Sequence, residues 1–210
     1  MITHSRMAGL FLLLPLFLAL VLTSGCRKRE AFEILSAPPT PKGLPTYWEI
    51  PDFTLTDQSG KSVQLGDFAG KVWVADFFYS TCPGPCPMLS SRLSDVQKEF
   101  ASAADLRLVS ISIDPEKDTP AVLQAYATKF KANDRWIFLT GEKAAIYRLA
   151  REGFKVPLAD RETPDGLITH SARLMLIDQT GTVRGFYEAE NQQGMADLFA
   201  GIRTLLSSKP

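Results

Sequence analysis

The sequence has little cysteine and little histidine. Its 210 residues include 3 Cys and 2 His, and its 23 basic and 23 acidic side chains balance. Three cysteines are too few for a scaffold held by several disulfides, and a cysteine-rich zinc module needs four ligands. Without a basic excess the chain has no electrostatic footprint for nucleic acid, so we expect no nucleic-acid partner. A hydrophobic fraction of 45% and a charged fraction of 22% describe an ordinary globular protein and not a disordered one.

The first 25 residues have the pattern of an export leader. Residues 7–26 carry no charge, and residues 10–22 are apolar except for Pro15. This run of thirteen suits the core of a signal peptide better than a membrane span, which needs roughly 20 residues. Small residues then precede Cys26, which resembles the bacterial lipobox, where the cysteine is lipidated and becomes the new N-terminus. We predict a lipoprotein signal peptide over residues 1–25 and lipidation of Cys26, with an uncleaved anchor as the alternative.

The remaining chain is predicted to form a tether and one folded domain. Residues 26–47 contain four prolines and little apolar periodicity, which is typical of a tether that holds a domain off a membrane. Residues 48–208 alternate strand and helix patterns and are expected to form the domain, on the extracytoplasmic (periplasmic) face. That compartment is oxidising, so a close pair of cysteines would oxidise there unless it is reduced or bound to a metal.

The patterns after residue 48 predict an α/β fold, a mixed sheet flanked by helices. The run 72–79 is apolar apart from Asp76, as a buried central strand is. Two similar turns, 57–60 and 178–181, each end in glycine and are typical of hairpins. The order of elements resembles the thioredoxin fold, here with an N-terminal β-hairpin. Strands are expected at 53–55, 62–65, 72–79, 106–113, 136–139, 172–177 and 183–187, and helices at 88–100, 119–131, 142–151 and 195–206.

The reactive side chains gather at Cys82 and Cys86, between the predicted central strand and a helix. Pro83 and Pro85 fix the backbone φ, which keeps Cys82 on a stiff loop while Cys86 enters the first helical turn. The positive end of the helix dipole is expected to lower the pKa of a thiol there. Two such thiols can attack a disulfide, form one with each other, or bind a soft metal, and the pair alone does not decide among these.

His170 is the one histidine outside the predicted leader, and it directly precedes the strand expected at 172–177. In a thioredoxin-type sheet that strand runs antiparallel beside the central strand, so we expect His170 next to Cys82. Two thiolates and an imidazole suit copper, because thiolates favour Cu(I) and imidazole accommodates the higher oxidation state. Zinc could use the same ligands but normally takes a fourth. The candidate metal ligands are therefore Cys82, Cys86 and His170, around one copper ion as Cu(I) or Cu(II).

Several spaced motifs resemble the Sco/SenC family of copper-binding assembly proteins. They are FFYSTCPGPCP at 77–87, SIDPEKDTP at 112–120, FLTG at 138–141, THS at 169–171 and LID at 176–178. The resemblance covers about residues 48–207 and implies a thioredoxin-like, membrane-attached domain that holds copper with Cys82, Cys86 and His170. Two positions depart from the family. Gly84-Pro85 stands where a polar residue is frequent, and Thr169 stands where an acidic residue is usual.

The same resemblance implies a metallochaperone rather than an enzyme. Such a protein delivers copper to, or reduces the thiols of, the binuclear copper site of cytochrome c oxidase subunit II or a related copper oxidase. Other copper carriers or thiol reductants would be its further partners, and a lipid anchor would join it to the membrane.

Two other functions remain open for the same cysteine pair. One is an extracytoplasmic thiol-disulfide oxidoreductase, in which Cys82 and Cys86 form a redox-active pair, and the other is a redox or copper sensor. Oxidoreductases of this fold usually carry a cis-proline just before the strand that here follows His170, and its absence counts against the first. Asp114 and Asp118 are expected to end a strand and begin a helix, with an acidic loop beside the metal as the alternative.

Replacing Cys26 by alanine is expected to block lipidation and to leave residues 1–25 attached, because this kind of leader is cleaved after the cysteine sulfur is modified. Mass spectrometry of the protein from membrane fractions, with and without the Cys26→Ala substitution, measures the mature N-terminus. An unsubstituted mature protein that keeps residues 1–25 would contradict the lipoprotein prediction.

Overall fold

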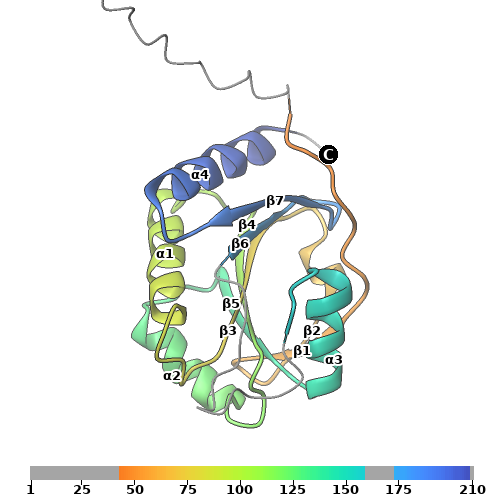
Figure 1. Cartoon of the computed structure of the whole chain (residues 1–210), viewed down its shortest axis with the longest axis vertical. Coiled ribbons are helices and arrows are strands. Elements are labelled where there is room, and N and C mark those ends of the chain that lie inside the picture. Colours follow the sequence, from red (N-terminus) through yellow and green to blue (C-terminus); the bar gives the residue numbers. More distant parts are fainter. Residues whose placement is uncertain (1–42, 159–172, 209–210) are drawn as a thin grey trace, which may run out of the picture. The chain divides into compact units, whose positions relative to one another are not determined.

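The computed structural model describes residues 43–158 and 173–208 (Figure 1). Cys26 and His170 lie outside these residues, as do the leader and most of the tether. In chain order the elements are β1 (Thr54–Asp57), β2 (Ser62–Gln64), the 3-10 helix η1 (Leu65–Phe68), β3 (Val72–Phe78), α1 (Cys86–Glu99), β4 (Leu106–Ser112), α2 (Pro120–Lys129), β5 (Trp136–Thr140), α3 (Lys143–Arg148), the π-helical turn η2 (Leu149–Gly153), β6 (Arg173–Ile177), β7 (Val183–Glu188) and α4 (Gln192–Ser207).

One mixed sheet of seven strands organises the described residues, in the order β2-β1-β5-β4-β3-β6-β7. β3, β4 and β5 pair in parallel, joined by α1 and α2 as crossover connections. The hairpins β1–β2 and β6–β7 add antiparallel pairs at the two edges. The predicted mixed α/β sheet with an N-terminal hairpin is therefore confirmed.

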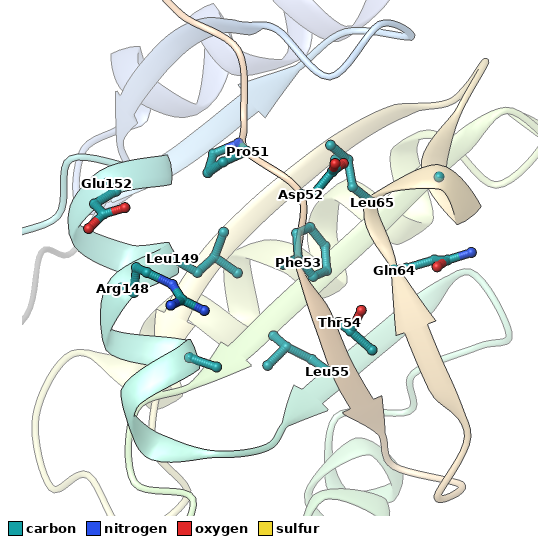
Figure 2. Close-up of a pocket in the computed structure, with 12 residues that line it drawn as sticks. Pro51, Asp52, Phe53, Thr54, Leu55, Gln64, Leu65, Arg148, Leu149 and Glu152 are labelled. Atoms are coloured by element: carbon teal, nitrogen blue, oxygen red, sulfur yellow. The ribbon is translucent and has the colours of Figure 1, made fainter.

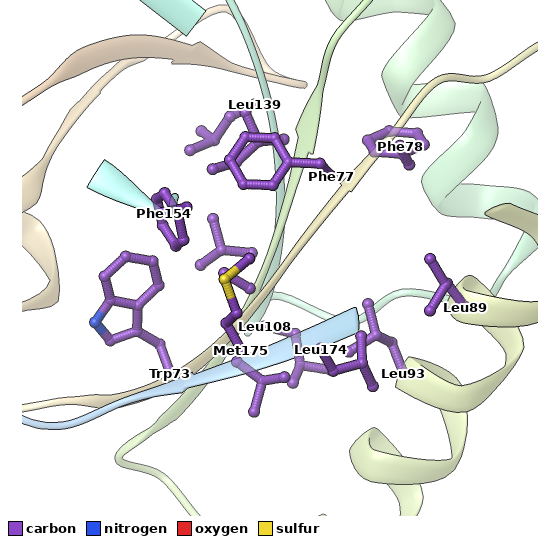
Figure 3. Close-up of a cluster of buried hydrophobic side chains, with 14 of the residues drawn as sticks. Trp73, Phe77, Phe78, Leu89, Leu93, Leu108, Leu139, Phe154, Leu174 and Met175 are labelled. Atoms are coloured by element: carbon purple, nitrogen blue, oxygen red, sulfur yellow. The ribbon is translucent and has the colours of Figure 1, made fainter. Parts of the chain in front are cut away.

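β3 is buried along its whole length because both faces of the sheet are covered. Successive side chains of a strand point to opposite faces. Trp73 and Phe77 pack against Phe154, with ring centroids 5.9 and 5.1 Å away, while Phe78 packs against Tyr126 of α2 at 5.0 Å. α1, α2 and α4 lie on one side of the sheet and α3 on the other (Figure 1), and Figure 3 shows the two layers of core side chains. This burial fixes the strand that leads into the cysteine pair.

The two similar turns form as the sequence predicts. The side chains of Asp57 and Asp178 each accept hydrogen bonds from the backbone N–H groups two and four residues further on, at 2.8–3.1 Å. Gly60 and Gly181 follow with φ of 83° and 84°, in the left-handed region that glycine adopts without strain. The hairpin registers β1–β2 and β6–β7 are set by these turns.

Two helices begin earlier than the apolar periodicity predicts. α1 begins at Cys86 instead of residue 88, because Pro85 supplies a pre-set φ at its N-cap. α4 begins at Gln192 instead of residue 195, because the side chain of Asn191 accepts the N–H of Gly194 at 2.6 Å. In residues 43–158 and 173–208, no helix combines the length and apolar character that a membrane crossing requires.

Candidate metal centre

Cys82 and Cys86 lie where β3 gives way to α1. Directly after β3 the chain turns, and the N–H of Cys82 donates to the carbonyl of Tyr79 at 3.2 Å. Cys86 is the first residue of α1, and the carbonyl of Pro85 accepts the N–H of Leu89 at 2.9 Å. The loop position of Cys82 and the helical position of Cys86 agree with the sequence-based expectation.

The two cysteines are not joined by a disulfide, and both have little exposure, 7% for Cys82 and 0% for Cys86. Burial raises the pKa of the Cys86 thiol above its ordinary value, because the thiolate loses its water. Interaction with the Cys82 side chain adds to this pKa shift, and the backbone of Tyr79, which hydrogen-bonds to the sulfur, opposes it. The expected lowering of a thiol pKa by the helix dipole is wrong for Cys86, since desolvation outweighs it.

A buried carboxylate, Asp76, lies close enough to the thiols to act on them. It is fully buried on β3 opposite Ser110 of β4, and neither carboxylate oxygen has a hydrogen-bond partner among the described residues. Burial raises the pKa of Asp76 to about 7, and a polar interaction with the Ser110 side chain, short of a well-formed hydrogen bond, partly opposes this rise. The charge of Asp76 in turn contributes to the raised pKa of Cys86. The sequence signal for this group was a single acid inside an apolar strand.

Asp118 is a second buried carboxylate, and it contacts the loop that carries Cys82. Thr119 caps α2, as predicted, with its side chain accepting the N–H of Val122 at 3.5 Å. Asp118, one residue earlier, instead accepts hydrogen bonds from Ser80 and Ser112. Asp118 therefore not only precedes α2 but also contacts the loop that follows β3.

His170, the third predicted ligand, lies outside the described residues. β6 begins three residues after it, at Arg173, and pairs antiparallel with β3, Met175 standing opposite Ala75. β6 therefore begins at the edge of the sheet where β3 ends, which is the edge that leads to Cys82. Within 43–158 and 173–208, no cluster of three or more His, Cys, Asp or Glu side chains is arranged to hold a metal ion.

A cavity beside α3 is separate from the thiols. A cavity of about 650 Å³ lies between β1, η1 and α3 (Figure 2). Its lining mixes apolar Phe53 and Leu149 with charged Asp52, Arg148 and Glu152. Neither cysteine lines this cavity, so the thiol pair at the β3–α1 junction is a separate site.

A reduced dithiol at the junction of a buried central strand and a helix, in a mixed sheet of this order, defines a thioredoxin-like thiol protein. The SCO1/SenC family model matches residues 44–207. The chain belongs to the SCO1/SenC family, as the sequence motifs predict.

Three solved structures are similar to this chain, each at 30% identity. A SCO1/SenC family lipoprotein from Bacillus anthracis covers 75% of this chain and 95% of its own, with a TM-score of 0.70. The second structure is BsSco, in which a disulfide switch was identified and which is a member of the Sco family of cytochrome c oxidase assembly proteins. It covers 80% of this chain and 98% of its own, with a TM-score of 0.69. ScoI from Bradyrhizobium japonicum with copper bound covers 71% and 97%, with a TM-score of 0.61. These structures confirm the thioredoxin-like fold and agree with copper as the predicted metal.

Replacing Asp76 by asparagine is expected to stabilise the domain clearly more at about pH 8 than at about pH 5. The folded protein keeps a proton on Asp76 up to about pH 7, whereas the unfolded chain loses it near 3.8. Stability therefore falls as the pH rises through this window, by up to roughly 4 kcal/mol, and asparagine removes the loss. Urea unfolding at both pH values measures the free energy of unfolding of the parent and of Asp76→Asn. Substitution of the exposed Asp105 by asparagine is the control. An equal effect of Asp76→Asn at the two pH values would refute this prediction.

Cys82 is expected to react with iodoacetamide at least roughly tenfold faster than Cys86, because it is the more exposed and the Cys86 pKa is raised. The matched variants Cys86→Ser and Cys82→Ser each leave one thiol of the pair, and mass spectrometry follows alkylation of each over time. Faster or equal modification of Cys86 would show that the thiols are not arranged as described.

Proposed function

We propose that this protein is a copper-binding metallochaperone. It delivers copper to, or reduces the thiols of, the binuclear copper site of cytochrome c oxidase subunit II or a related copper oxidase. The observation that carries this proposal is the buried, reduced thiol pair Cys82 and Cys86 at the β3–α1 junction of a SCO1/SenC fold. Relatives of this fold are described as cytochrome c oxidase assembly proteins and as copper-bound.

Copper is the metal whose chemistry fits this thiol pair. Soft thiolates favour Cu(I), and the apolar side chains around Cys86 exclude the water and oxygen ligands that hard cations prefer. A site with only two cysteines and His170 stays three-coordinate and open on one side. The thiols of an acceptor can then enter and displace Cys82 and Cys86 one at a time, so that copper is never released into water.

The third ligand in this proposal is His170. The antiparallel pairing of β3 and β6 supports this, because β6, which begins three residues after His170 in the sequence, starts at the edge of the sheet where β3 ends. An imidazole there allows the same site to hold either Cu(I) or Cu(II).

The proposed location is the extracytoplasmic (periplasmic) face of a membrane, through a lipid on Cys26. The similar lipoprotein from Bacillus anthracis supports this part of the proposal. An oxidising compartment also requires that the thiol pair be kept reduced or metal-bound, which makes thiol reductants and other copper carriers the expected partners.

A thiol-disulfide oxidoreductase is the second candidate, favoured by the interaction of the two thiols and by the greater exposure of Cys82, 7% against 0% for Cys86. In that reaction the Cys82 thiolate attacks a client disulfide and releases one client thiolate. Cys86 then attacks the mixed disulfide, which leaves Cys82–Cys86 oxidised and the client fully reduced.

Copper titration of the reduced full chain, purified in detergent, separates the two candidates. We expect one tightly bound equivalent and a Cu(II)–thiolate absorption band. Cys82→Ser and Cys86→Ser are expected to abolish the band, and His170→Ala to weaken copper binding by about 10- to 100-fold. Ser171→Ala, which alters the neighbouring side chain and keeps the imidazole, is the matched control. If His170→Ala binds copper like the parent and the protein reduces disulfides efficiently, the oxidoreductase replaces the chaperone.

A further inference from the structure

We propose that Asp118 is a positioning residue for the thiol pair. It holds the turn that carries Cys82 in one conformation, and so sets the arrangement of the two sulfurs before any metal arrives. The part of this proposal that concerns copper rests on the proposed function, while the part that concerns the thiols does not.

Three donors converge on the Asp118 carboxylate, which is fully buried. Its Oδ2 accepts the backbone N–H of Ser80 at 3.0 Å and the hydroxyl of Ser112 at 2.5 Å. Its Oδ1 accepts the hydroxyl of Ser80. A carboxylate can accept all three bonds, whereas an asparagine would point an N–H₂ group at one of the donors.

Ser80 is the residue through which Asp118 reaches both thiols. The turn that follows β3 runs from Tyr79 to Cys82, closed by the bond from the Cys82 N–H to the Tyr79 carbonyl. The backbone of Tyr79 also hydrogen-bonds to the Cys86 sulfur. Fixing Ser80, between Tyr79 and Cys82, therefore fixes the backbone groups that locate both cysteines.

Asp118 can act as a fixed point because its own backbone is held. Its N–H donates to the carbonyl of Asp114 at 2.9 Å, in the tight connection from β4 to α2. The N–H of Ile113 donates to the carbonyl of Phe78 at 2.9 Å and continues the β3–β4 pairing to the base of the turn. The Asp118 carboxylate thus connects the loop between β3 and α1 to the loop between β4 and α2.

A turn that is fixed in advance matters because the proposed site must bind and release a metal ion. Groups around metal ligands that fix ligand orientation are commonly worth about 10- to 100-fold in metal affinity. A loop that is already ordered also loses less conformational freedom when a ligand binds. With Ser80 released, Cys82 can leave Cys86, and both metal binding and disulfide closure become less favourable.

The test compares Asp118→Asn with Asp178→Asn in the full chain, purified in detergent. Asp178 is the matched control, since it too is buried and accepts backbone and hydroxyl donors, but in the β6–β7 turn away from the cysteines. One readout is Cu(I) affinity by competition with bicinchoninate. The other, without metal, is the equilibrium between the Cys82–Cys86 dithiol and its disulfide in glutathione buffers, and urea unfolding reports stability for both variants.

Asp118→Asn is expected to weaken Cu(I) binding by about 10- to 100-fold and to shift the thiol equilibrium toward the dithiol by at least about threefold. Asp178→Asn is expected to lower stability and to leave both readouts within about twofold of the parent. If the two variants lose stability alike and neither moves the two readouts, Asp118 is only a structural brace and the proposal fails.

Ser80→Ala keeps the test decisive if Asp118→Asn does not fold. It removes one hydroxyl donor and leaves the backbone N–H, so the same shifts are expected at smaller size, and unchanged readouts would overturn the proposal. If the parent protein binds no copper but Asp118→Asn or Ser80→Ala still shifts the thiol equilibrium, Asp118 stands as a positioning residue and the copper function fails.

Discussion

The turn from Tyr79 to Cys82 is the constraint on which the thiol site depends. Its closing hydrogen bond places Cys82, and the same backbone holds the Cys86 sulfur. The turn keeps its place because β3 is buried on both faces and enters it in a fixed direction. Asp118 adds a connection from the β4–α2 loop. The sheet, the two crossover helices and the buried carboxylate therefore support one short loop.

Desolvation is the dominant electrostatic effect around this loop. Cys86 stands at the N-terminal end of a helix, where the dipole favours a thiolate, yet its pKa is raised because the side chain is removed from water. Asp76 carries the same penalty, with its pKa raised to about 7 and no hydrogen-bond partner for its oxygens in the described part of the chain. Desolvation disfavours any unpaired charge, so a metal ion held here would have to be neutralised by the thiolates that bind it, as in the proposed copper site.

Local patterns in the sequence were sufficient for the fold and for the position of the cysteines. The apolar run at 72–79, the glycine turns and the Thr119-Pro120 helix start all predicted elements that the structure contains, because each depends on neighbours in the chain. The raised pKa of Cys86 and the contact of Asp118 with Ser80 were not predictable in this way. The pKa of Cys86 depends on side chains packed from several elements, and the contact of Asp118 with Ser80 joins residues 38 positions apart. Cys26 and His170 lie outside the described residues, and their roles stay predictions.

X-ray absorption spectroscopy of the Cu(I)-loaded protein tests whether Cys82, Cys86 and His170 hold the metal, because it reports the atoms bound to copper. We predict a shell of two sulfur atoms and one imidazole nitrogen per copper, with the imidazole signal lost in His170→Ala and one sulfur lost in Cys82→Ser. A copper shell without the paired sulfurs, or a spectrum that does not change in His170→Ala, would contradict it.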